Sequence, residues 1–158
     1  HYMKQEKNLA IKIFLSFIKN EWNKNEESLL FEHFGKLVDE VYVFDCINQG
    51  GEMDELVEMG IIDKENIKPG STLPCDMVFN RIHITVEGYL SACCADFDGY
   101  LAAVDLHQMS LKDAWESTAM QDLRKRHLEN DLKGTVCYNC IFNKKDAVYP
   151  INKELCHL

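Results

Sequence analysis

The sequence contains no apolar run that approaches the roughly 20 residues of a transmembrane helix. Its N-terminus also lacks a basic segment followed by an apolar stretch, so no secretory signal peptide is predicted. Basic residues are few, because 17 Lys and Arg stand against 26 Asp and Glu, for a net charge of −9. Phosphate contacts need Lys and Arg, so nucleic acid and anionic membrane surfaces are not expected as partners. We therefore expect a cytoplasmic protein.

The composition is that of a folded chain. Hydrophobic residues make up 46% and charged residues 27%, which are globular values and not those of a disordered tail. A length of 158 residues suffices for one domain, or for one small domain and part of another.

The first half of the chain predicts a strand, a helix and a second strand. Residues Ile11–Ile18 and Val41–Phe44 are short apolar runs, typical of buried strands. Between them, apolar residues recur at helical spacing over 26–39, with Asn25 as the expected N-cap. The short links favour a βαβ unit with parallel strands.

The second half predicts a different arrangement. Residues 52–74 indicate a short helical piece and a linker. Side chains alternate over Met77–Thr85, and Tyr89–Cys94 follows after the turn signal Glu87-Gly88, so a β-hairpin is predicted.

A loop is expected over 96–105, followed by one helix. Ser110 is suited to cap its first turn, and the helix is expected to end near Asn130–Gly134. Its predicted inner face comprises Leu111, Ala114, Trp115, Thr118, Ala119 and Leu123. Together the two halves predict an α+β fold.

Seven cysteines are present, and no secretion signal accompanies them, so metal binding is favoured over disulfides. The pair Cys137-x-x-Cys140 can place two thiolates on one metal or cluster. By itself this pair serves zinc ribbons, redox dithiols and iron–sulfur sites alike. It follows a helix and a glycine, which argues against a thioredoxin-type dithiol.

Two further ligands are expected at the ends of the predicted hairpin. Cys75 precedes the first strand, and Cys93 or Cys94 ends the second, so a hairpin would bring them together. The cysteine of this pair that does not ligate is expected to be a small buried thiol. Cys46 is expected in the core, and Cys156 in a frayed tail.

The cysteines belong to a longer series of motifs, which comprises Pro74-Cys75, Gly88-x4-Cys93-Cys94-x-Asp96, Ser110-Leu111-x3-Trp115-x-Ser117, Leu123-Arg124 and Cys137-x-x-Cys140. In this order and spacing, the stretch resembles the SPASM/twitch accessory domain of radical SAM enzymes.

Residues 11–45 are similar to the last strand–helix–strand part of the radical SAM partial (β/α) barrel. The resemblance is carried by Ile13–Phe17, Asn25-Glu26 and Val38-Asp39-Glu40-Val41. It predicts a barrel remnant over 1–50, a linker over 51–74 and a cluster domain over 75–158.

The resemblance implies one auxiliary [4Fe-4S] cluster, held by Cys75, Cys93, Cys137 and Cys140. The Gly-x4-Cys spacing of the family selects Cys93 as the ligand of its pair. Two-cluster relatives carry further cysteines soon after the last motif, and none lies between Cys140 and Cys156. Such a cluster passes electrons or positions substrate. The alternative is a structural zinc module for protein–protein contact, since four thiolates also suit Zn²⁺.

No Cys-x3-Cys-x2-Cys triplet, which the family needs to cleave S-adenosylmethionine (SAM), occurs in the sequence. We therefore expect part of a radical SAM oxidoreductase or maturase that is inactive alone. Its expected partner is the missing N-terminal barrel, where SAM would bind. The substrate, a peptide or a small molecule, stays open.

Four residues near the cysteines are expected to have accessory roles. Arg124 is expected to hydrogen-bond the cluster edge, and Trp115 to shield the cluster from water. His83 and His107 are expected at the surface or facing substrate, and not as ligands. The loop over 96–105 is expected to face the active site.

Overall fold

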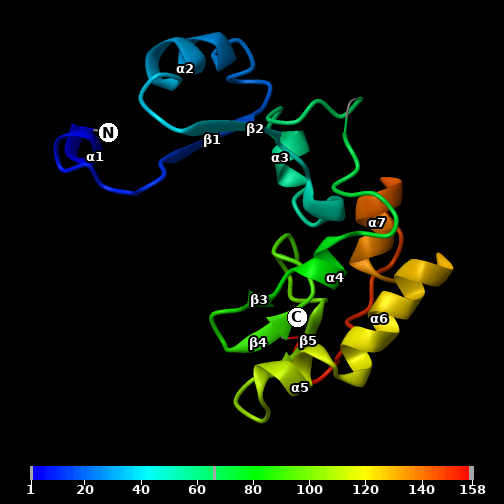
Figure 1. Cartoon of the computed structure of the whole chain (residues 1–158). Helices are drawn as coiled ribbons and strands as arrows, with labels where there is room; N and C mark the ends of the chain where they lie inside the picture. The colour runs from blue at the N-terminus through cyan, green and yellow to red at the C-terminus, as the bar shows by residue number, and fades with distance from the viewer. Residues whose placement is uncertain (1, 66, 157–158) are drawn as a thin grey trace. The chain divides into compact units, whose positions relative to one another are not determined.

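The computed structural model describes residues 2–65 and 67–156, and the chain divides into two compact units (Figure 1). The first unit comprises residues 1–46 and 55–66, and the second comprises residues 47–54 and 67–158. The mixture of helices and strands confirms the α+β prediction, whereas the predicted domain boundaries stay a prediction. Within the described ranges, no helix is both long and apolar enough to cross a membrane.

The first unit is built on two parallel strands, β1 (Phe14–Lys19) and β2 (Glu40–Asp45), which are connected through helix α2 (Glu27–Phe34). Short helices α1 (Tyr2–Glu6) and α3 (Glu55–Glu58) belong to the same unit. The predicted strand–helix–strand order and the parallel pairing are confirmed. A partial barrel is not shown by two strands and stays a prediction.

Helix α2 is shorter than the predicted span of 26–39. Glu26, and not Asn25, occupies its N-cap position, and no side chain caps the helix there. Two hydrogen bonds between Asp39 and Ile13 account for the early end of the helix. The Asp39 amide donates to the Ile13 carbonyl at 2.9 Å, and the Ile13 amide donates to Asp39 Oδ2 at 2.7 Å. The residues before Asp39 must therefore turn back toward β1.

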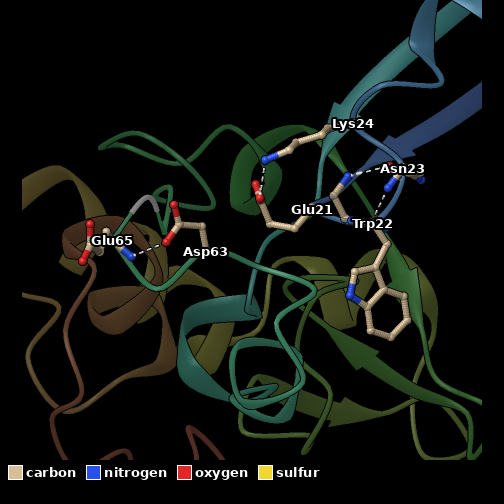
Figure 2. Close-up of polar contacts among 7 residues, drawn as sticks. Glu21, Trp22, Asn23, Lys24, Asp63 and Glu65 are labelled. Carbon is tan, nitrogen blue, oxygen red and sulfur yellow. Dashed lines mark hydrogen bonds and ion pairs between the residues drawn. The ribbon is translucent and has the colours of Figure 1, made fainter.

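A polar turn connects β1 to α2 (Figure 2). Asn20 Oδ1 accepts from the amides of Trp22 at 2.9 Å and Asn23 at 3.2 Å, and Asn23 Oδ1 accepts from the Asn20 amide at 2.8 Å. Lys24 Nζ and Glu21 Oε2 form an exposed ion pair at 2.6 Å. The two asparagine side chains satisfy amides that have no strand or helix partner, so the chain can reverse here.

The second unit combines an antiparallel sheet with short helices. Three strands pair in the order β3-β4-β5. The strands are β3 (His83–Ile84), β4 (Tyr89–Ser91) and β5 (Ala102–Asp105). The helices are the 3-10 turn η1 (Gln49–Gly51), α4 (Met77–Asn80), α5 (Leu111–Trp115), α6 (Thr118–Glu129) and α7 (Val136–Phe142).

The predicted hairpin is present, but the predicted first strand over Met77–Thr85 is wrong in its first half. The Asp76 carbonyl accepts from the amides of Phe79 at 3.0 Å and Asn80 at 2.9 Å, which closes a helical turn. This turn buries Val78, which is 1% exposed. The strand begins only at β3, because burial of Val78 overrides the alternating pattern.

Strand β5 was not predicted, because its residues were assigned to a loop. Ala102 and Ala103 have little strand preference, and their small side chains carry no alternating signal. Both are 2% exposed, and Val104 pairs with Leu90 of β4. The strand therefore exists because both of its faces are covered.

The single helix predicted after Ser110 is two helices. The Ser110 hydroxyl accepts from the Asp113 amide at 3.2 Å, which confirms the predicted start. Ser117 interrupts the helix and caps α6, since its hydroxyl accepts from the Met120 amide. The end at Asn130, in the left-handed conformation, agrees with the prediction.

The core of the second unit lies between the sheet and these helices. Its fully buried members include Val78, Leu90, Ala92, Leu101, Ala114, Met120, Leu123 and Leu132. Two of the cysteines, Cys75 and Cys137, belong to the same cluster of buried residues, with 7% and 8% of their surface exposed. The core therefore supports the cysteine site directly.

Candidate iron–sulfur site

The four predicted ligands, Cys75, Cys93, Cys137 and Cys140, line one cavity of about 270 Å³ in the second unit. Cys75 precedes α4, Cys93 follows β4, and the other two lie in α7. The structure thus gathers thiols from three separate segments around one space. Cys94 also lies on the wall of this cavity.

Helix α7 presents Cys137 and Cys140 together. Thr135 caps it, with its hydroxyl accepting from the Tyr138 amide at 3.3 Å. Positions three apart lie on one face of a helix, so both thiols can point to the cavity. Gly50, at φ +72°, lets the η1 backbone approach Cys140 closely, because a Cβ there would lie 3.0 Å from the Cys140 backbone nitrogen.

Cys75 is fixed by a buried histidine that the sequence analysis missed. The Cys75 amide donates to His127 Nδ1 at 3.4 Å, and His127 is 1% exposed. Burial lowers the pKa of His127 to about 4, so its ring is neutral near pH 7. The signal in the sequence was its spacing from Met120 and Leu123, which puts His127 on the buried face of α6.

Cys93 and Cys94 are adjacent in the chain but differ in their exposure to solvent. Cys93 is half-buried, and its sulfur accepts from the Ala95 amide at 3.3 Å. Cys94 is exposed, so the prediction of a small buried thiol there is wrong. The strand ends at Ser91, before both cysteines, so strand alternation does not set their directions.

The site is electrostatically unfavourable for free thiolates. Burial raises the pKa of Cys93 to about 12, and burial also raises the pKa values of Cys137 and Cys140, with the neighbouring cysteines adding to each shift. Near pH 7 these groups are protonated unless cationic iron or another metal compensates for the charge of the thiolates.

The donor set fits an iron–sulfur group. Four soft thiols surround a space far larger than one ion, which suits a cluster whose irons are bound by separate cysteines. Within the described part of the chain, no three ligating side chains converge as they would around a single metal ion.

Two carboxylates hold the loop that follows Cys93, and Glu52 was not recognised from the sequence. Asp96 Oδ2 accepts from the Leu101 amide at 2.7 Å, while Glu52 Oε2 accepts from the amides of Phe97 at 2.7 Å and Asp98 at 3.2 Å. Burial raises the pKa of Glu52 to about 7 and also raises the pKa of Asp96. These bonds link the η1 segment to the loop beside the cavity.

Trp115 packs against the core, as its place on the predicted inner face requires, but the predicted contacts of Trp115 and Arg124 with the cluster are wrong. Arg124 donates through Nε to the Val78 carbonyl at 3.1 Å and through Nη1 to the Trp115 carbonyl at 2.8 Å. Its guanidinium lies 4.0 Å from the centre of the Trp115 ring. Neither residue lines the cavity. They join α4 to α5 and α6, so their effect on the site is through the fold.

The histidines and isolated cysteines lie away from the cavity wall. His107 is exposed and contacts Asp105, and neither it nor His83 lines the cavity. Cys46 lies in the first unit and is only half-buried, so its predicted place in the core is wrong. Cys156 is not frayed, since its sulfur lies 3.9 Å from the Asp98 carbonyl.

Residues 75–141 match a known family, SPASM, described as an iron–sulfur cluster-binding domain. The matched segment contains all five cysteines that line the cavity, and the four predicted ligands are among them. No curated protein and no solved structure matches the chain. The match indicates that this segment binds an iron–sulfur cluster.

Proposed function

We propose that the second unit holds one auxiliary [4Fe-4S] cluster as the accessory domain of a radical SAM enzyme. The observation that carries the proposal is that Cys75, Cys93, Cys137 and Cys140 line one cavity within the segment that matches the cluster-binding family. When bound, the cluster would supply one-electron chemistry.

The chain's own residues favour electron transfer or structural support over substrate ligation. Four cysteines can occupy the outer position of every iron, which leaves no iron for a substrate atom. Cys137 is 8% exposed and Cys75 is 7% exposed, so the core shields half of the ligand set from water. His127 and the Ala95 amide hold two of the ligating segments in place.

Anaerobic reconstitution with iron and sulfide tests this function. We expect about four iron and four sulfide per chain, with a broad visible absorption that bleaches on reduction and an EPR signal of the reduced state. One tightly held zinc per chain and no stable cluster would instead favour a structural zinc module.

We further propose that the first unit packs against additional parallel strands, which a radical SAM barrel would provide. Apolar side chains on one face of its sheet are exposed: Phe14 by 52%, Ile18 by 57% and Phe44 by 54%. On this face the Tyr42 ring stacks on Phe14 at 6.0 Å and on Phe44 at 6.2 Å, so three aromatic rings form a stripe beside the polar Ser16 and Glu40. Parallel sheets in proteins are normally covered on both faces.

The variant Phe44→Ser tests whether this face of the sheet is exposed to solvent in the isolated chain. We expect Phe44→Ser to reduce the binding of a hydrophobic fluorescent dye while changing the free energy of unfolding by less than about 0.5 kcal/mol. The control is Val43→Ser on the opposite, half-buried face, which should destabilise the unit more. Equal destabilisation by both variants would show that the stripe is already covered.

A further inference from the structure

The segment before Cys75 places two hydrogen-bond donors on the wall of the cysteine cavity. Gly70 and Ser71 both line this cavity. The Ser71 hydroxyl donates to Cys75 Sγ, with 2.9 Å between oxygen and sulfur. This bond is short for a sulfur acceptor, so the hydroxyl is well placed to interact with a Cys75 thiolate.

Gly70 lies close to a second cysteine, Cys140. Its amide donates to the Cys140 carbonyl at 3.1 Å, which holds this segment against the cysteine. A Cβ at position 70 would lie 2.4 Å from Cys140 Sγ. Only glycine therefore allows the backbone to lie this close to the sulfur.

We infer that Ser71 raises the reduction potential of the cluster that the proposed function places in this cavity, and that Gly70 leaves Cys140 Sγ the space it needs to hold that cluster. This inference rests on that function, and it assigns both residues as positioning residues of the redox site. Hydrogen bonds to ligand sulfurs stabilise the reduced cluster, because it carries one more negative charge than the oxidised cluster.

The local charge makes such donors important. Asp96, a carboxylate, also lines the cavity. Carboxylates disfavour the reduced state, and the chain as a whole has a net charge of −9. No Lys or Arg lies on the described wall of the cavity, so the donors to sulfur there are hydroxyl and amide groups.

The test is a redox titration of the reconstituted chain with dithionite, followed by EPR. We expect Ser71→Ala to keep its iron and sulfide but to have a more negative midpoint potential than the unmodified chain. Ser71→Thr retains the hydroxyl and should restore the original midpoint. Thr72→Ala is the matched control, because Thr72 is exposed and its side chain does not line the cavity.

A midpoint that does not change in Ser71→Ala would overturn the inference while leaving cluster binding intact. If Ser71→Ala takes up less iron, the midpoint is measured on the fraction that holds a cluster, and Ser71→Val is compared with Ser71→Thr. Failure of the unmodified chain to hold iron and sulfide would instead overturn the proposed function as well.

The variant Gly70→Ala tests the role of Gly70 separately from that of Ser71. The Gly70 backbone does not need a positive φ, so the substitution tests the space around position 70, where an added Cβ would lie 2.4 Å from Cys140 Sγ and 3.1 Å from Ile47 Cδ1. We expect reduced iron content or an altered EPR spectrum, since the added methyl group must displace Cys140 Sγ. An iron content, spectrum and midpoint identical to those of the unmodified chain would contradict the assignment of Gly70.

Discussion

Replacing Cys93 with serine is expected to remove most of the iron and sulfide from the reconstituted chain, whereas Cys94→Ser should leave both nearly unchanged. The two residues are adjacent, have the same chemistry and both line the cavity. They differ in burial, because Cys93 is half-buried and accepts a hydrogen bond from the Ala95 amide, while Cys94 is exposed. Iron and sulfide analysis after anaerobic reconstitution measures the difference.

The pair of variants separates ligation from general damage to the site. Both substitutions replace one sulfur with oxygen at the same turn, and circular dichroism of both variants reports any loss of folding, to which the half-buried Cys93 is the more sensitive position. Loss of the cluster in Cys94→Ser with retention in Cys93→Ser would exchange the ligand assignment. Retention in both would show that neither thiol is required, and then three cysteines, Cys75, Cys137 and Cys140, would have to hold the cluster.

Metal identity is read from the same samples. Zinc can replace iron in protein that is purified in air. Metal analysis of the unmodified chain before and after reconstitution with iron and sulfide therefore shows which metal the site prefers. The match of residues 75–141 to an iron–sulfur cluster-binding family favours iron and sulfide over zinc.

Truncating Leu123 to alanine is expected to destabilise the second unit by about 2–5 kcal/mol. Leu123 is 1% exposed and lies in the same buried cluster as Cys75 and Cys137. The substitution therefore leaves a cavity in the core that supports the site, and it should also reduce iron uptake. Urea unfolding followed by circular dichroism measures the change in the free energy of unfolding.

Leu128→Ala is the control for this prediction. Leu128 lies in the same helix, α6, but is 68% exposed. Its substitution has the same chemistry and helix propensity change, so it should alter the free energy of unfolding by less than about 0.5 kcal/mol. Similar losses in both variants would mean that helix propensity, and not burial in the core, determines the effect.

Local sequence patterns were enough to predict those elements whose residue types by themselves favour a strand, a helix or a helix end. The apolar runs around Phe17 and Val43 predicted two strands, and the helical spacing between them predicted α2 and hence parallel pairing. Ser110 and Asn130 marked the ends of the helical region, because capping and left-handed conformations depend on residue type. The Cys-x-x-Cys pair needed no distant information, since α7 itself brings its members to one face.

Only the tertiary structure decided the rest. Val78 lies in a helical turn because the core requires its side chain, and Ala102 and Ala103 form a strand because both of their faces are covered. His127 contacts the Cys75 amide across 52 residues, and Ser71 and Gly70 approach two different cysteines. The contacts of His127 with Cys75 and of Gly70 with Cys140 join segments far apart in the chain, and the Ser71 contact with Cys75 depends on how the core fixes the turn between them, so no local pattern of residue types encodes them.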